Sequence, residues 1–539
     1  GRPPFSGGTP LALLQAMLRA DAPALAGFPA LAPVLSRALK NDRADRYPNA
    51  EAMATALSAA RGAAAQAPEP GIRLVVLPFR LLREDAEIDF LEGALPGAIT
   101  SSLSNLPNLL VRSNLAAAHY GSTADPIRVG ADLDVNHVLT GTILRAGSRL
   151  RVACQLIEAP GGRVAWSGTK EIPMGDLFQL QDDISSHIVD SLPIEGARPD
   201  HKDVDVPATA RAYELFLRAN QIAHDRVSWP RARALYEECL AEDDNFAPAW
   251  TMLGRVHRLI GKYLEEDVES CYAAAGAAFA RAFHLRPTLS IAHHQFAYLE
   301  VEQGYSDRAM IRISTQLRER PNQPELYAAL CHVSRYCGLL DVSLTADERA
   351  RRLDPRVRTS VVNTHLLVAD YTSMLQAAHG VADTLLAIAR FELGAVDEAV
   401  DICRAEQLRF AAGTTAHLFP LCLIAAFRND PAAGAMAAEL FAMTEWFPDG
   451  EFHFYTARLL ARSGQTDAAV AALNRAITLG FFPAQVFAGD PWLAAAHEAP
   501  AFAAVCARAW DRHRTAIDTF DAVGGYALLG LKRDTRPLR

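Results

Sequence analysis

The sequence predicts a mainly helical chain: an α-solenoid of stacked helix pairs, preceded by a small α/β domain and by a short helical segment. Two sets of residues repeat at an interval of 34 residues: the prolines Pro287, Pro321 and Pro355, and the glycines Gly304 and Gly338. This interval indicates one helix–turn–helix unit per repeat. Residues 71–194 differ, because a β-branched apolar run and alternating segments there are typical of strands. The first 60 residues show only helical spacing.

Length and composition limit the possible functions. A chain of 539 residues is long enough for two to four domains. A net charge of -9 argues against a dedicated nucleic-acid or anionic-membrane surface. The eight cysteines include no CxxC pair, so we expect buried free thiols in a reducing compartment and a cytoplasmic protein. The longest uncharged run, residues 410–427, contains His417 and Pro420 and predicts a repeat helix instead of a membrane span.

Residues 1–60 predict three helices, Leu11–Leu18, Leu31–Leu39 and Ala50–Leu57, with Asn49 as the N-cap of the last. Gly1–Gly7 and Lys40–Met53, with the spacing Asp42-x-x-x-Arg46-Tyr47, resemble the end of the C-terminal lobe of a bacterial Ser/Thr protein kinase. Arg43 stands where that family usually has proline. The resemblance implies a partial kinase lobe, and the start at Gly1 instead of Met suggests a fragment of a kinase-linked parent.

Phosphoryl transfer needs a Gly-rich loop, a strand lysine, a catalytic Asp–Asn loop and a metal-binding Asp. None of these occurs in the 539 residues, so we expect no catalytic residue, no cofactor and no metal site in this chain. In the family, the arginine that matches Arg46 pairs with a glutamate near the activation segment, and that glutamate is absent here.

Residues 61–70 are mostly small and end in a proline-containing segment, which predicts a linker. The next 124 residues predict the order β-α-β-(α)-β-β-β-α, over these segments: strands Ile72–Phe79, Leu109–Val111, Val135–Leu144, Arg149–Leu156 and Arg163–Glu171, and helices Leu91–Leu106 and Phe178–Leu192. Gly93 and Gly141 could face a ligand, although tight packing is the commoner reason for such glycines.

Four segments of this stretch are similar to the TolB-like N-terminal domain that accompanies tetratricopeptide arrays in bacterial signalling proteins: Val76–Phe79, Phe90–Leu95, Leu133–Thr142 and Asp176–Ile184. The resemblance spans nearly all of residues 71–194 and implies a small α/β domain without a reaction of its own. Residues 195–207 then predict a second linker.

Residues 208–480 resemble the tetratricopeptide (TPR) family and predict about seven repeats, each made of a helix A and a helix B. The register rests on these positions: Ala232, Tyr236, Cys239 and Asp244 in the first repeat, Trp250 and Gly254 in the second, and Gly394, Asn429 and Gly464 in the last three. The second repeat closes about nine residues late, at Phe279–Pro287. Residues 481–523 predict capping helices, and residues 524–539 a frayed tail.

Other clusters point to structure more than to chemistry. His293-His294 lacks two further ligands at a fixed spacing, so we expect no metal there. The acidic run Glu265–Asp267 and the basic run Arg349–Arg352 are interpreted as solvated helix faces. We expect the TPR groove to bind a protein or peptide, with partner-binding positions chosen by register alone: Arg255, Arg258, Gln295 and Arg335.

We interpret the chain as the non-catalytic interaction part of a kinase-linked bacterial signalling protein, and two alternatives stay open. One is that the chain represents an active Ser/Thr kinase whose catalytic residues lie upstream of Gly1. The third class is a transcriptional or adenylate-cyclase regulator that has the same TolB-like and TPR parts. The kinase-like first 60 residues argue against that third class.

Overall fold

The computed structural model divides the chain into two compact units, residues 1–71 and 72–539. In the first unit it describes residues 34, 37, 38, 40, 46–50, 52 and 53. In the second it describes residues 72–533 except 86, 104–105, 107–108, 113–115, 118, 160, 174–175, 193–206, 265–266, 355–356, 379–383, 411 and 445. The linker 61–70, residues 195–206 of the second linker, the final six residues and Pro355 therefore lie outside the described residues.

The described residues of the first unit support one local prediction. Asn49 Oδ1 accepts a hydrogen bond of 2.8 Å from the backbone N–H of Ala52, as an N-cap does, and residues 50, 52 and 53 are helical. The Arg46 guanidinium donates from Nε to the backbone oxygen of Lys40 at 2.7 Å. The predicted helix Leu11–Leu18 and most of Leu31–Leu39 lie outside the described residues, so the kinase-lobe interpretation stays a prediction.

The second unit begins with a mixed α/β domain that has the predicted order of elements. Its strands run in the order β3-β1-β4-β5-β6, with β2 beside β4. The bounds are β1 Ile72–Val76, β2 Arg80–Leu81, α4 Leu91–Leu103, β3 Leu109–Val111, α6 Pro126–Asp132, β4 His137–Ala146, β5 Arg149–Glu158, β6 Val164–Pro173 and α7 Leu177–Ser191. Strands β3, β1 and β4 are parallel, and β4, β5 and β6 form an antiparallel meander. The short strand β2 was not predicted.

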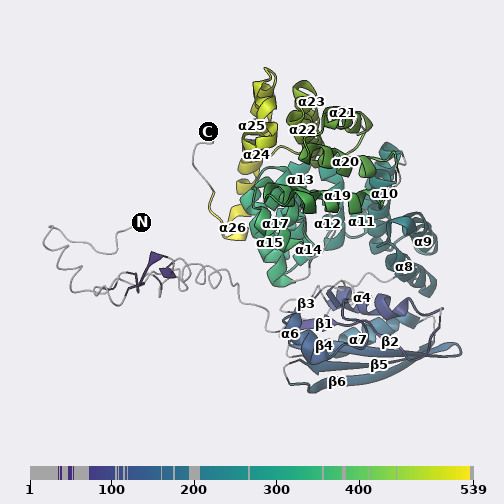
Figure 1. Cartoon of the computed structure of the whole chain (residues 1–539). Coiled ribbons are helices and arrows are strands. Elements are labelled where there is room, and N and C mark those ends of the chain that lie inside the picture. The colour runs from purple at the N-terminus through teal and green to yellow at the C-terminus, as the bar shows by residue number, and fades with distance from the viewer. Residues whose placement is uncertain are drawn as a thin grey trace. The chain divides into compact units, whose positions relative to one another are not determined.

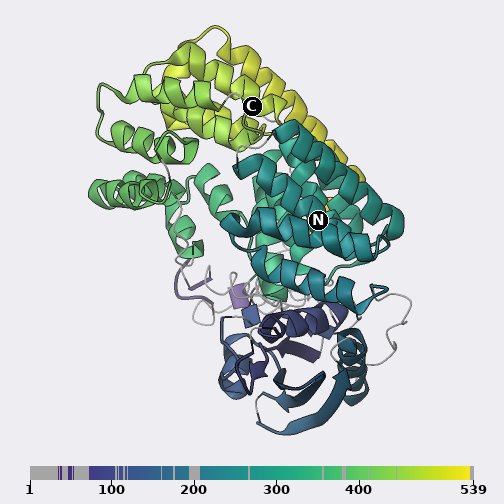
Figure 2. The same cartoon turned by 90° about the vertical axis from the view of Figure 1, so that its right-hand side faces the viewer.

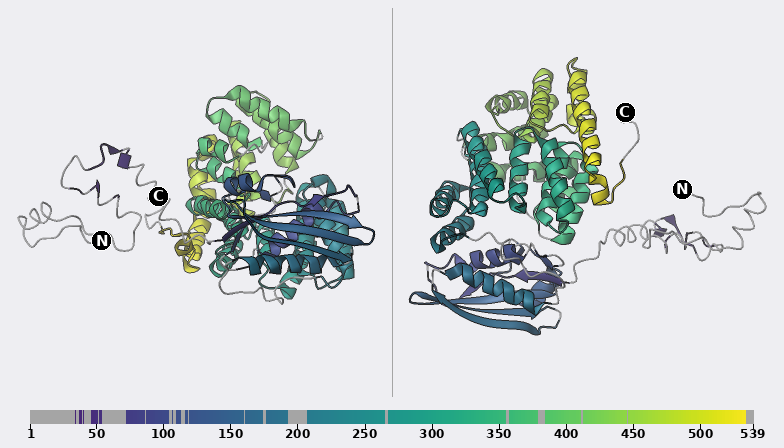
Figure 3. Two further views of the ribbon diagram at one scale, coloured as in Figure 1. Left: turned by 90° about the horizontal axis from the view of Figure 1, so that it is seen from below. Right: turned by 180° about the vertical axis from the view of Figure 1, so that it is seen from behind.

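Alternation along β1 assigns its side chains to two cores. Leu74 and Val76 pack into a large cluster with α4 and α7, whereas Val75 joins Val129 and Val138 on the opposite face. Figure 3 shows helices of this domain layered on one side of the long meander, the side on which α4 and α7 pack. A Cβ on Gly141 would lie 2.8 Å from the Phe79 ring, so tight packing explains this glycine.

The remaining described residues form a TPR-like solenoid of helix pairs (Figures 1 and 2). The pairs are α8 Ala210–Ile222 with α9 Trp229–Glu242, α10 Ala247–Tyr263 with α11 Val268–Leu285, α12 Ser290–Glu302 with α13 Ser306–Glu319, α14 Pro324–Tyr336 with α15 Leu340–Leu353, α16 Val361–Leu367 with α17 Tyr371–Ala377, α18 Thr384–Glu392 with α19 Val396–Gln407, α20 Thr415–Phe427 with α21 Ala433–Met443, and α22 Gly450–Arg462 with α23 Thr466–Thr478. A short 3-10 turn, η3 Arg226–Ser228, precedes α9.

The predicted period is confirmed where it was clearest. Helices α12 and α13 map onto α14 and α15 by a shift of 34 residues at each of their four ends. Gly304 and Gly338 occupy the same turn with φ of 87° and 77°, a left-handed conformation that costs glycine little. The late close of the second repeat is explained by the length of α10 and α11, which have 17 and 18 residues.

The described array holds eight helix pairs, one more than the approximate count of seven. The additional pair is α16 with α17, each only 7 residues long. Its turn uses Ala369 at φ 56° instead of a glycine, and the pair α20 with α21 uses Asn429 at φ 51°. Trp250 is half-buried and packs against the hydrophobic cluster of α8, α9 and α10, and its Nε1 donates to Asp244 O at 2.8 Å.

The C-terminal helices do more than cover the last repeat. They are α24 Ala484–Gly489, η4 Pro491–Glu498, α25 Phe502–Ala522 and α26 Gly525–Leu529. Helix α25 packs against both α23 and α13, and α26 packs against α13 and α15. The predicted frayed tail begins too early, because Tyr526 and Leu529 are only 7% and 4% exposed.

These contacts close the array on itself. The N–H of Phe482 donates to Tyr336 O at 2.9 Å, and Ser306 Oγ donates to Gly480 O at 2.8 Å. The backbones approach so closely that a Cβ on Gly338 would lie 2.8 Å from Nδ1 of His513. The repeats around α13 and α14 are therefore packed against the C-terminal part of the array as well as against their sequence neighbours. We call this part, from α22 to α26, the C-terminal limb. Among the described residues, no helix combines the length and the apolar character that crossing a bilayer requires.

Candidate functional site

Closure brings four A helices, α10, α12, α14 and α22, onto one buried polar cluster. Its charged members come from distant parts of the chain: Arg258, Lys262, Glu302, Arg335, Asp449 and Glu451. They project inward because each repeat turns the same face of its helix A toward the inside of the array.

The first half of the cluster is centred on Glu302. Its carboxylate accepts from Arg258 Nη1 at 2.7 Å, from Lys262 Nζ at 2.9 Å and from the Tyr272 hydroxyl at 2.7 Å. The Glu302 side chain is only 2% exposed. Three donors from α10 and α11 thus compensate for the burial of one carboxylate of α12.

Asp449 joins this half to the C-terminal limb. The Lys262 ammonium donates to Asp449 Oδ2 at 2.9 Å, and the Tyr336 hydroxyl donates to Oδ1 at 2.7 Å. Asp449 also caps α22, since its Oδ1 accepts from the N–H of Glu451 at 2.9 Å. One side chain therefore starts α22 and attaches it to α10 and α14.

The second half is a bidentate pair between α14 and α22. Arg335 donates from Nε and Nη2 to the Glu451 carboxylate at 3.0 and 2.9 Å. Tyr455 adds a third hydrogen bond to Glu451 at 2.9 Å, and Arg335 Nη1 donates to Ser360 O at 2.9 Å. The two side chains are 1% and 6% exposed, so this pair is shielded from solvent.

The electrostatics favour the charged forms of Lys262, Asp449 and Arg335. Burial alone would lower the pKa of Lys262, but Asp449 and Glu302 outweigh burial and hold that pKa well above its ordinary value. Burial raises the pKa of Asp449, yet Lys262 reverses the effect and holds the pKa well below its usual range. Arg335 stays protonated because Glu451 raises its pKa against the effect of burial. Burial also raises the pKa of Glu451.

Rings fill the space between these charges. The His332 imidazole stacks on Tyr298 with ring centres 4.4 Å apart and also lies 4.8 Å from the Tyr336 ring. Burial, aided by Arg335, holds the pKa of His332 well below its ordinary value, which keeps the imidazole neutral. Its Nδ1 accepts from Arg335 Nη2 at 3.1 Å. The stack therefore fixes the position of the Arg335 guanidinium.

The four partner-binding positions predicted from register fall into two classes. Arg258 and Arg335 are buried and already paired with Glu302 and Glu451. Arg255 and Gln295 are half-buried on the same inner side of α10 and α12. Arg255 makes a long 3.4 Å hydrogen bond to Ala223 O, and in the described part of the chain no carboxylate pairs with it.

Sequence reasoning missed the acidic half of the cluster. Glu302, Asp449 and Glu451 follow no local motif, and their Lys and Arg partners lie 40 to 187 residues away. The available signal was polar residues at inward positions of A helices, where a repeat core favours apolar ones.

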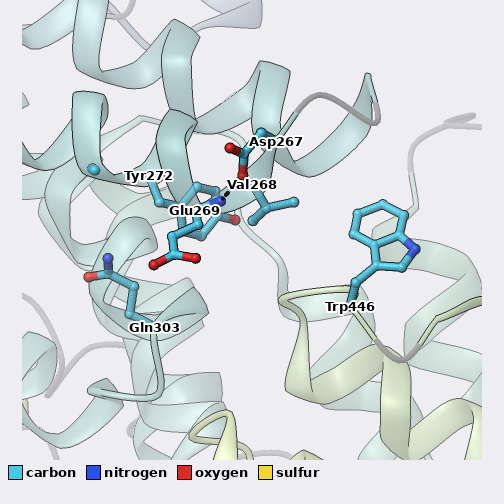
Figure 4. A pocket seen from close by; sticks show the side chains of 7 residues that line it. Asp267, Val268, Glu269, Tyr272, Gln303 and Trp446 are labelled. Atoms are coloured by element: carbon cyan, nitrogen blue, oxygen red, sulfur yellow. Dashed lines mark hydrogen bonds between the residues drawn. The ribbon is translucent and has the colours of Figure 1, made fainter.

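A pocket of about 890 Å³ opens beside the cluster (Figure 4). One wall is the first turns of α11, with Asp267, Glu269 and Tyr272, next to Gln303 at the end of α12. Trp446, in the loop before α22, forms the opposite wall. The pocket thus lies between two parts of the array that Lys262 and Asp449 hold together.

The paired histidines have packing roles. His293 Nε2 forms a 2.8 Å hydrogen bond with Pro287 O, and its ring packs on Phe283. The His294 ring packs edge-on against Tyr298. Within the part of the chain that the structure describes, no group of three or more His, Cys, Asp or Glu side chains could hold a metal ion.

The comparisons with known proteins do not identify a family for this chain. No protein-family model matches it. A protein of Rhizobium meliloti (strain 1021) described as "Putative adenylate cyclase 3" is 27% identical over 185 residues, 33% of this chain and 32% of that protein. The chain thus spans about a third of that relative's length. A solved structure described as "Crystal structure of APC/C hetero-tetramer Cut9-Hcn1" is 13% identical, covers 66% of this chain and 84% of the other, and has a TM-score of 0.32. A TM-score this low carries no argument, so the repeat assignment rests on the helix pairs themselves.

Proposed function

We propose that the helical array is a scaffold that binds a segment of a protein partner. The observation that carries the proposal is the array of stacked helix pairs with its 34-residue core period, because such arrays present extended inner surfaces that bind proteins. The segment lies along the A helices, at the part of the inner surface that the ion-pair cluster leaves accessible.

Arg255 and Gln295 are the contact residues of this proposal. Both side chains are half-buried. Burial and the nearby Arg258 lower the pKa of Arg255, so the folded protein leaves this guanidinium without charge compensation. An acceptor from a partner would supply that compensation. Arg258 and Arg335 act indirectly in this proposal, by fixing the surface on which the partner lies.

Peptide-display selection on the purified full chain tests the proposal. Enriched peptides should bind the double variant Arg255→Ala, Gln295→Ala at least about tenfold more weakly, the loss expected when about 1.4 kcal/mol of contacts is removed. The matched control is Arg231→Ala, on the exposed side of α9. Selection that enriches no peptide, or enriched peptides that bind the double variant unchanged, would contradict the proposal.

The scaffold is proposed to serve a bacterial signalling protein, with residues 71–194 as its TolB-like module. The kinase-like residues 1–60 favour a Ser/Thr kinase parent, including the alternative of an active kinase whose catalytic residues lie upstream of Gly1. The match to a protein named as an adenylate cyclase favours a cyclase-type parent as the second candidate. Eight free cysteines, seven of them buried, fit a reducing cytoplasm as the proposed compartment.

Reading the encoding gene upstream of Gly1 separates these parents. A lysine-bearing strand followed by HRD-type and DFG-type segments would support the kinase parent. A cyclase catalytic domain would support the second candidate. A sequence without either would contradict both assignments while leaving the scaffold proposal intact.

A further inference from the structure

We infer that the pocket between α11 and Trp446 binds an arginine-containing basic segment of the protein partner. This inference rests on the proposed scaffold function and specifies the chemistry of one binding site. The occupant is argued from three features of the pocket: the charge of its walls, its exposed indole and its position between two limbs of the array.

The walls are negatively charged. Asp267 and Glu269 are exposed at the first turn of α11, and no lysine or arginine is among the described residues that line the pocket. The Glu269 carboxylate has no basic partner in the described part of the chain. Directly behind this wall, Glu302 and Asp449 balance Arg258 and Lys262. Asp267 Oδ1 accepts the backbone N–H groups of Glu269 and Ser270 as the N-cap of α11, so the carboxylate that a cationic ligand meets without a partner is that of Glu269.

Trp446 supplies the second feature. Its side chain is 41% exposed, although Trp is usually buried in a repeat core. Phe447 contacts the indole with ring centres 5.7 Å apart and itself packs on Phe452 at 5.2 Å, so the exposed indole has a fixed support. The indole N–H donates to no group in the described part of the chain. An indole face opposite carboxylates attracts a guanidinium through cation–π and ionic contacts together.

The dimensions and position of the pocket fit a peptide more than a small ion. A volume of about 890 Å³ falls within the range of about 300–1,000 Å³ that is usual for ligand pockets. Figure 4 shows Trp446 across the open space from the first turn of α11, where the Glu269 carboxylate turns toward Gln303. A segment with an extended cationic side chain can span these two sides, whereas a bare metal ion would find ligands on one side only.

Fluorescence anisotropy on the full chain tests the inference. The probes are a labelled ten-residue peptide of alternating Arg and Ala and a matched peptide with Glu in place of Arg. The Arg peptide should bind and the Glu peptide should not. Binding should weaken as ionic strength rises, because exposed charges are screened over about 8 Å at 0.15 M salt. Free arginine as a competitor distinguishes recognition of a single side chain from recognition of a segment.

Two variants locate the binding site. Glu269→Gln should weaken the Arg peptide roughly threefold, as loss of one exposed ionic contact does. Trp446→Ala should weaken it about tenfold through loss of the cation–π contact. Both residues are exposed, so circular dichroism should show unchanged folding. The matched control Glu237→Gln, on the exposed side of α9, should bind as the wild type does.

The outcomes separate this inference from the function on which it rests. Losses in both pocket variants, with none in Glu237→Gln, support the pocket. Equal binding by all variants, or equal binding of the Arg and Glu peptides, overturns it. In that case, display-selected peptides that still depend on Arg255 and Gln295 would leave the scaffold function standing. Selection that enriches no peptide would overturn the scaffold function and this inference with it.

Discussion

Removing the carboxylate of Glu451 should loosen two limbs of the array at once. The change Glu451→Ala leaves the Arg335 guanidinium buried at 1% exposure, without its bidentate partner. It also removes the acceptor of the Tyr455 hydroxyl. Breaking a buried pair in this way costs about 3–5 kcal/mol, because the remaining charge is desolvated without compensation.

The chain offers a matched exposed pair as the control. Arg390 and Glu398 lie 3.4 Å apart with side chains 40% and 64% exposed. The change Glu398→Ala should therefore cost less than about 1 kcal/mol. The double change Arg335→Met, Glu451→Leu should recover much of the loss, since apolar residues of similar volume replace buried ion pairs with little penalty.

Urea unfolding followed by circular dichroism measures the cost, and hydrogen exchange locates it. In an open solenoid the effect of Glu451→Ala would remain in α22 and its sequence neighbours. In the closed array, exchange should also accelerate in α14, whose Arg335 lies 116 residues before Glu451. A loss no larger than that of Glu398→Ala, or faster exchange confined to α20–α23, would refute the argument that this pair holds the limbs together.

Three further outcomes are expected. Gly338→Ala should lower the melting temperature more than Gly464→Ala. Both glycines have positive φ, but only at Gly338 would the new Cβ lie within 3 Å of His513 and Pro483. Equal changes in melting temperature would contradict the close approach. Burial lowers the pKa of His293 to about 4, so below about pH 6.5 the unfolded chain binds more protons than the folded chain. Stability should therefore be highest above pH 6.5 and should fall on acidification, by roughly 2 kcal/mol at pH 5 for this residue, with a smaller slope in His293→Gln; identical slopes in urea titrations would contradict this assignment. The purified chain should show no Mg-dependent ATP turnover, because its sequence lacks the phosphate- and metal-binding motifs; measurable turnover would overturn that expectation.

The sequence predicted those parts of the fold that local rules determine. Strand β3 was predicted at Leu109–Val111, where the structure has it, because a short apolar run between turn signals is typical of a buried strand. The turns at Gly304 and Gly338 could be located because a left-handed residue after helix A favours glycine. The pair α16 with α17 was missed for the same reason: its turn uses Ala369, and its helices are too short to show a period.

The polar cluster could not be predicted from local rules. Arg258 and Arg335 were chosen by repeat register as ligand contacts, whereas the structure pairs both with carboxylates of the same chain. Register identifies which side of helix A a residue occupies, but it does not show what lies opposite. Which residue lies opposite depends on how strongly the array curves. The curvature is the sum of small rotations between successive repeats, and the sequence of one repeat does not determine that sum.

Closure also links the proposed pocket to the stability of the array. Trp446 comes three residues before Asp449, which anchors α22 to Lys262, and Glu269 comes three residues before Tyr272, which donates to Glu302. A ligand that contacts Glu269 and Trp446 together requires the two limbs at their closed separation. Binding of that ligand would therefore stabilise the closed array, and the free energy gained would rise with the logarithm of the ligand concentration above the Kd. Conversely, a variant that loosens the limbs, such as Glu451→Ala, should weaken the Arg peptide without touching the pocket walls, because binding and closure are reciprocal.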